Sequence, residues 1–117
     1  MIGARGEATI TAGEREVQIL YTNRALAEAE QALGKSIVGV AQGFLDGTSG
    51  IYDIAQVLHA GMKAARREAR ERGPQVTLDQ VYAVLDQAGF AAVAAAVMEA
   101  VTAVLSYGPE EEPDPNA

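Results

Sequence analysis

Residues 16–34, with the sequence EVQILYTNRALAEAEQALG, contain the change of pattern that decides the fold. In the first part, Val17, Ile19 and Tyr21 alternate with other residues and share one face, which is the period of a β-strand. After Thr22, a good helix N-cap residue, the apolar side chains follow a helical spacing until a glycine ends the pattern. This stretch therefore predicts a strand followed directly by a helix.

A second strand is predicted immediately upstream. Glu7–Thr11 alternates polar with small or apolar residues, and the turn Ala12–Arg15 separates it from Glu16–Tyr21. Gly13 within this turn can adopt a positive φ. We therefore expect a β-hairpin over about residues 6–21. Because a two-stranded hairpin is not stable alone in water, it must pack on the rest of the chain.

The remainder of the chain is predicted to be helical. The expected helices are one after Thr22, a short one over Ser36–Leu45, a long one from Ile51 to Gly73-Pro74, a fourth from the capping box Thr77–Gln80 to Gly89, and a fifth over Phe90–Tyr107. In the fourth helix we expect Leu78, Val81, Tyr82 and Leu85 to face inward. The fold class is therefore mostly α with a short N-terminal β-hairpin (α+β), a small bundle of about five helices over about residues 22–107.

The chain is the size of one domain, 117 residues, and we assign residues 1–107 to it. The formal net charge is −7, from 9 Lys and Arg against 16 Asp and Glu. Four of these acids lie in residues 108–117, expected to be a disordered acidic tail, and the body keeps 12 acids against 9 bases. Because phosphates repel an acidic protein, we expect no nucleic-acid partner.

The reactive side chains are few. The chain has no cysteine and one histidine, His59, which excludes thiol chemistry, disulfides and zinc sites of the Cys and His kind. Ser36, Ser49 and Ser106 do not lie in a nucleophile elbow, and no carboxylate pair has the fixed geometry of acid–base catalysis. We therefore expect no enzyme activity, no cofactor and no metal.

Gly34-Lys35-Ser36 matches the end of the phosphate-binding loop motif. The full motif needs a glycine at position 29, where this chain has alanine, and a strand before it. A helix is predicted there instead, so we interpret these three residues as a turn between two helices.

The most apolar stretch is Phe90–Tyr107, with Glu99 near its middle. A glutamate at the centre of a bilayer is costly, so we expect a buried helix and no membrane contact. The first residues, Met1–Glu7, lack the apolar core of a secretory signal. We expect a cytoplasmic protein.

A basic ridge is the first candidate for partner contacts. Lys63, Arg66, Arg67 and Arg70 are spaced i, i+3, i+4 and i+7 on the third predicted helix. A solvated helix end, whose cations oppose the helix dipole, is favoured. A docking ridge for an acidic protein and a nucleic-acid site are the alternatives.

The fifth predicted helix is the second candidate, because it is apolar nearly all round. Val97, Val101, Val104 and Leu105 either fill the core of the bundle or form half of a partner interface. Burial in the core is favoured, since a small bundle needs one well-buried helix. An exposed hairpin edge offers a further contact, through which two copies of the chain can pair.

Three segments resemble the small phage-tail proteins of gene transfer agents and siphophage-like prophages that are described as tail assembly chaperones. The segments are the start Arg5-Gly6-Glu7, the helix Ala25-Leu-Ala-Glu-Ala-Glu-Gln-Ala-Leu-Gly34, and Leu85-Asp-Gln-Ala-Gly89. The resemblance covers roughly residues 5–107 and contains no catalytic motif. It carries no residue-level functional site to this chain.

The resemblance implies a chaperone of tail assembly, which binds the tape-measure protein and helps to recruit tail-tube subunits. A structural minor tail or tail-completion protein of the virion is the alternative, and a small helical regulatory or DNA-binding protein is a further one. A tube-forming subunit is not expected, because polymerisation into a tube needs a larger sheet than the single hairpin that this sequence predicts.

Overall fold

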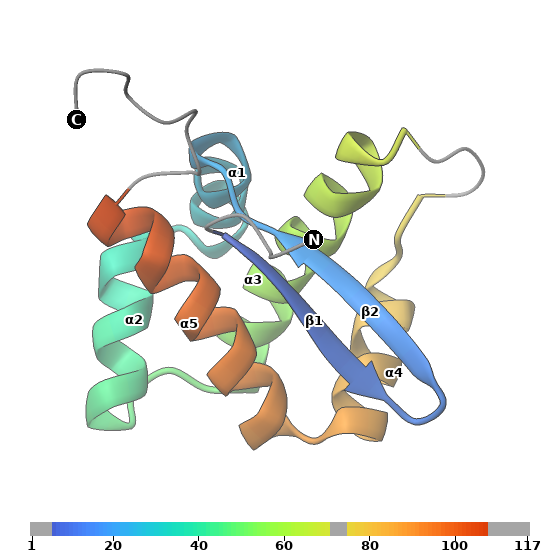
Figure 1. The fold of residues 1–117 in the computed structure, drawn as a ribbon. Coiled ribbons are helices and arrows are strands. Elements are labelled where there is room, and N and C mark those ends of the chain that lie inside the picture. The colour runs from blue at the N-terminus through green and yellow to red at the C-terminus, as the bar shows by residue number, and fades with distance from the viewer. Residues whose placement is uncertain (1–5, 71–74, 108–117) are drawn as a thin grey trace.

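The computed structural model describes residues 6–70 and 75–107 (Figure 1). Its elements are β1 (Glu7–Ala12), β2 (Arg15–Leu20), α1 (Asn23–Leu33), α2 (Ile37–Asp46), α3 (Ile51–Glu68), α4 (Leu78–Ala88) and α5 (Phe90–Tyr107). The predicted fold class is confirmed: a small α+β fold with five helices and one N-terminal hairpin in the described part. The predicted tail, residues 108–117, lies outside the described residues.

The hairpin has the predicted turn. β1 and β2 pair antiparallel, with Glu7 opposite Leu20 at one end and Ala12 opposite Arg15 at the other. The two-residue turn has Gly13 at φ +66°, the sign that a hairpin turn of type II′ requires at its first position. Apolar side chains share the inner face (Ala8, Ile10, Ala12, Val17, Ile19), and polar ones share the exposed outer face (Thr9, Thr11, Glu16, Gln18).

The inner face of the hairpin covers the helices (Figure 1). β2 packs on α3, while β1 packs on α4 and α5. α3 is the central helix, since it also contacts α1, α4 and α5, and half of its 18 residues are buried. Its Ile54, Val57 and Leu58 have no exposed surface. The centre of the fold is therefore α3, and the more apolar α5 lies at one side of it.

Tyr21, the residue after β2, fixes the hairpin to α3. Its side chain is fully buried, and its hydroxyl donates to the carbonyl oxygen of Val57 at 2.8 Å. The ring lies on Gly61, where a Cβ atom would come within 2.6 Å of it. The backbone N–H of Tyr21 donates to the carbonyl of Gly6 at 2.7 Å and extends the strand pairing. Burial raises the pKa of this phenol far above its usual value.

The helix ends follow the predicted capping residues. Thr22 and Ser36 accept hydrogen bonds from backbone N–H groups in the first turns of α1 and α2. Thr77 and Gln80 form the predicted capping box. The Thr77 hydroxyl oxygen accepts from the backbone N–H of Gln80 at 3.2 Å, and the Gln80 side-chain oxygen accepts from the backbone N–H of Thr77 at 3.0 Å. Gly34 ends α1 in the left-handed conformation. Local residue chemistry therefore sets these boundaries.

The end predicted for the third helix is wrong. α3 ends at Glu68, and does not continue to Gly73-Pro74, because Arg70 has a left-handed φ of +55°. No residue of α3 beyond Ala64 is buried, so no packing stabilises further turns.

The inward face predicted for the fourth helix is also partly wrong. Val81 and Leu85 are buried as expected, together with Val84, whereas Leu78 is 38 % and Tyr82 37 % exposed. The three buried residues follow the i, i+3, i+4 spacing of one helix stripe. Their stripe faces β1, α3 and α5, which leaves the other two side chains at its edge.

Gly61→Ala is expected to destabilise the protein. The new methyl group would overlap the buried Tyr21 ring, and overpacking of this kind costs about 2 kcal/mol in free energy of unfolding, more than the gain in helix propensity. Urea unfolding measures the change. Gly50→Ser is the control, because a Cβ at that position meets nothing within 4 Å. Equal stability of Gly61→Ala and the native chain would contradict the close packing.

Tyr21→Phe is expected to change the response to alkaline pH. The raised pKa keeps the phenol neutral in the folded chain, while the unfolded chain ionises near pH 10. The contribution of Tyr21 to the free energy of unfolding of the native chain is therefore constant below about pH 10. Above that pH it falls by about 1.4 kcal/mol per pH unit. Urea unfolding from about pH 8 to 11 should show that the free energy of unfolding falls less steeply with pH in Tyr21→Phe than in the native chain. Parallel curves would rule out this linkage.

Candidate interaction surface

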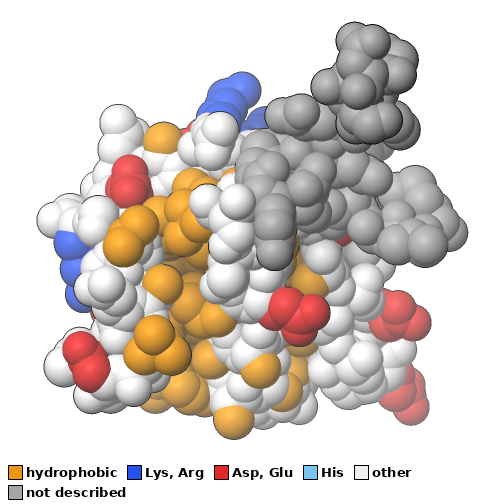
Figure 2. Space-filling view, turned by 60° about the vertical axis from the view of Figure 1, so that its left-hand side comes forward, with side chains coloured by type: hydrophobic (Ala, Val, Ile, Leu, Met, Phe, Trp, Pro, Cys, Tyr) orange, Lys and Arg blue, Asp and Glu red, His pale blue; other side chains and the backbone are white. Residues whose placement is uncertain are grey.

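Exposed apolar side chains gather on α2 and α5. Leu45 is 90 % and Val38 51 % exposed on α2, and Leu105 is 44 % and Phe90 37 % exposed on α5. The rings of Phe44 and Phe90 lie with their centroids 6.2 Å apart, so the end of α2 is beside the start of α5. Figure 2 shows apolar side chains gathered on this side of the molecule. We call these five residues the α2–α5 face.

α2 has an apolar arc wider than its buried arc. Ile37, Val40 and Gly43 are buried and point toward the body of the protein. At 100° per residue, Leu45 and Val38 lie roughly 140–160° around the helix from the centre of this buried arc. The half-buried Phe44 and Ala41 lie between the two, so the apolar surface continues from the core to solvent. An exposed continuation of this kind is typical of an interaction surface.

More exposed apolar residues begin α3. Ile51 is 59 % and Tyr52 56 % exposed, directly after the loop that follows α2. This loop folds back on α2, because the Ser49 hydroxyl donates to the carbonyl oxygen of Val40 at 3.1 Å. The backbone N–H of Ser49 also donates to the carbonyl of Gly43 at 3.1 Å. The loop therefore holds the end of α2 in place and leaves its apolar arc open.

The turn predicted for Gly34-Lys35-Ser36 is confirmed as a connection between α1 and α2. The Nζ atom of Lys35 lies 2.7 Å from Oδ2 of Asp53, and Asp53 is only 8 % exposed. The carboxylate of Glu30 accepts from the backbone N–H of Ile37 at 2.8 Å.

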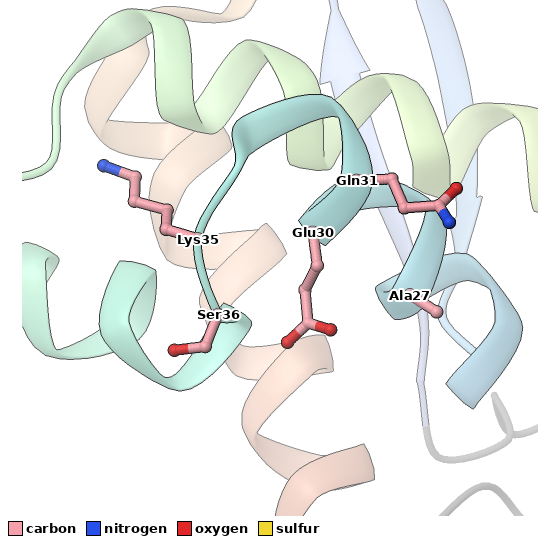
Figure 3. A pocket seen from close by; sticks show the side chains of 5 residues that line it. All are labelled: Ala27, Glu30, Gln31, Lys35 and Ser36. Atoms are coloured by element: carbon pink, nitrogen blue, oxygen red, sulfur yellow. The ribbon is translucent and has the colours of Figure 1, made fainter.

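An open depression of about 450 Å³ lies beside this turn. The side chains of Ala27, Glu30, Gln31, Lys35 and Ser36 line it (Figure 3). Glu30 and Lys35 extend in different directions, and the ammonium group is paired with Asp53. A bound phosphate would lie near the Glu30 carboxylate, which repels it, and the Lys35 ammonium group is already paired with Asp53. The depression therefore does not have the chemistry of a phosphate site.

Of the predicted basic ridge, Arg70 does not lie on α3. Lys63 and Arg66 are half-buried and Arg67 is exposed on α3, but Arg70 lies beyond the helix end. The guanidinium of Arg67 is 3.3 Å from a carboxylate oxygen of Glu28 on α1. The predicted i+7 position therefore does not exist on the helix, because α3 ends at Glu68, and the charge of Arg67 is paired with that of Glu28.

The valines of the fifth helix belong to the core. Val97 and Val101 are fully buried and Val104 is 3 % exposed, so the favoured interpretation agrees with their positions. Leu105 alone of this predicted group is exposed, and it lies on the α2–α5 face. Phe90, Leu45 and the other exposed apolar residues were not predicted as contacts, although the apolar arc of α2 is visible in the sequence.

His59 has a structural contact. Its Nε2 atom lies 2.9 Å from the carbonyl oxygen of Val76, which ties the segment before α4 to α3. Within residues 6–70 and 75–107, no three His, Cys, Asp or Glu residues form a group that could hold a metal. No single helix in this part is long and apolar enough to cross a membrane; α4 and α5 together pass by length and composition, but are bent by 112°.

The structure therefore defines a small helical α+β protein whose candidate site is a contact surface. Residues 5–104 match the family described as "Phage tail tube protein, GTA-gp10". This match spans most of the chain, and the chain belongs to this family of phage and gene-transfer-agent tail proteins. No curated protein and no solved structure matches the chain significantly. The predicted family is confirmed at the level of a tail-related protein.

Lys35→Met is expected to lower the free energy of unfolding by about 1 kcal/mol, because Asp53 then loses its cation while largely buried. Arg24→Met is the matched control. Its ion pair with Glu28 is 3.7 Å long and its side chain is 73 % exposed, so its loss should cost less than about 0.5 kcal/mol. Thermal or urea unfolding measures both. Equal effects would show that the Lys35–Asp53 pair adds nothing beyond a surface ion pair.

Proposed function

We propose that this chain is a structural component of a phage or gene-transfer-agent tail, a minor tail or tail-completion protein that binds the tail tube. The family match over residues 5–104 carries this proposal, because its description names the tail tube. Both this role and the one below place the protein in the cytoplasm of the bacterial host during assembly. Neither requires catalysis or a cofactor.

The size of the sheet favours a protein that joins the tube over a subunit that builds its wall. In the described residues the only sheet has two strands of six residues each. A hairpin of this size needs the helices beneath it for stability, and it leaves little sheet for a continuous wall. The helices supply most of the surface that a tail partner can contact.

The second candidate function is the tail assembly chaperone, which binds the tape-measure protein and recruits tube subunits. The α2–α5 face favours it, because Leu45 and Val38 are more than half exposed and continue the apolar core to solvent. Exposed apolar surface next to a helix pair is what a holder of an amphipathic helical client needs.

Quantification of the chain in purified particles tests the structural role against the chaperone role. A structural component is expected at a fixed copy number per particle, and its deletion should give particles with defective tails. A chaperone is expected to be absent from particles, and its deletion should make the tape-measure protein insoluble when the two are otherwise co-expressed. Normal tails and a soluble tape-measure protein after deletion would contradict both roles.

A further inference from the structure

We propose that α2 and the loop after it, residues 36–49, form a flap that opens by local unfolding while the body centred on α3 stays folded. In the described residues α2 is the only helix that packs substantially on neither α3 nor the hairpin, and its main contact is with α1. It lies at the edge of the molecule (Figure 1). This inference goes beyond the proposed function and depends on neither tail role.

The flap leaves the body and returns to it at one place. Lys35 directly precedes the flap, and its Nζ atom is 2.7 Å from Oδ2 of Asp53 in the first turn of α3. This ion pair holds the two ends of the flap close together on the body. Opening of the flap therefore leaves the packing of α1 on α3 intact.

Most hydrogen bonds around α2 join the flap to itself. The Ser49 hydroxyl donates to the carbonyl oxygen of Val40 at 3.1 Å. The backbone N–H groups of Thr48 and Ser49 donate to the carbonyl oxygen of Gly43 at 2.7 and 3.1 Å. These bonds connect the helix to its own loop and give no attachment to the body.

Few contacts tie the flap to the body. Among the described residues one hydrogen bond does so, from the backbone N–H of Ile37 to the carboxylate of Glu30 at 2.8 Å. The rings of Phe44 and Phe90 meet with centroids 6.2 Å apart, but Phe90 is 37 % exposed. The flap is therefore held mainly by the burial of two side chains, Ile37 and Val40.

The sequence of α2 gives the helix little stability of its own. It has ten residues, which is shorter than an isolated helix needs, and they include Gly39, Gly43 and three β-branched residues. A helix of this composition forms only against a packing surface. Once it leaves the body, α2 therefore unfolds, and the side chains of Ile37 and Val40 become exposed together with the surface that they cover.

Hydrogen exchange of the full native chain, followed by NMR at increasing low concentrations of urea, tests the proposal. We expect the amides of residues 41–46 in α2 to exchange at least about a hundredfold faster than those of residues 58–64 in α3, relative to an unfolded chain. Exchange in α2 should depend little on urea, because opening of the flap exposes little surface, whereas exchange in α3 should depend on it steeply. Equal protection and equal urea dependence of the two helices would overturn the proposal.

Two matched variants separate local opening from global unfolding. Leu85→Ala in α4 and Ile37→Ala in α2 each truncate a side chain of a residue that is 7 % or 4 % exposed. Leu85→Ala should speed exchange in α3 by about tenfold or more and leave exchange in α2 unchanged, because Leu85 stays packed while the flap is open. Ile37→Ala should speed exchange in both helices, because its contact is lost in either opening.

Circular dichroism checks that both variants are folded. If Leu85→Ala speeds exchange in α2 as much as in α3, the flap opens only with the whole protein and the proposal fails. Unchanged exchange of α2 in Ile37→Ala would also overturn it. The urea dependence in the native chain decides the question by itself if either variant does not fold.

Discussion

The burial of Tyr21 against α3 is the contact on which the rest of the structure depends. The residue directly follows β2, and its ring fits on Gly61 because no side chain is present there. Its hydroxyl bonds to the carbonyl of Val57, in the middle of the helix. A hairpin of two strands has no stability alone, so this anchor, with Ile10 and Ile19 beside it in the core, makes the strands part of the fold. It also brings β1 over α4 and α5, which buries the inner side of both helices.

A core centred on α3 leaves part of the apolar surface uncovered. The hairpin, α1, α4 and α5 occupy the sides of α3, and α2 lies next to α1 with Ile37, Val40 and Gly43 buried. A domain of this size buries only about two thirds of its unfolded surface. Part of the uncovered remainder lies on α2 and α5, and it includes Leu45 at 90 % exposure. The surface available for contacts is thus a consequence of how few elements the fold has.

The sequence predicted features that depend on neighbouring residues and missed those that depend on packing. The hairpin turn at Gly13 and the capping box at Thr77 follow from local chemistry, and both are present. The end of α3 and the exposure of Tyr82 depend on which residues meet another element, and both predictions were wrong. The pair that Lys35 forms joins residues 18 positions apart, and no local pattern indicates it. The apolar arc of α2 was visible, but the sequence does not tell which part of it the core covers.

Charge and apolar exposure on the α2–α5 face have to be considered together. An exposed leucine on a helix promotes association with any apolar surface, including another copy of the chain. The chain carries a formal net charge of −7, so two copies of it repel each other. This net charge opposes self-association through the exposed leucine.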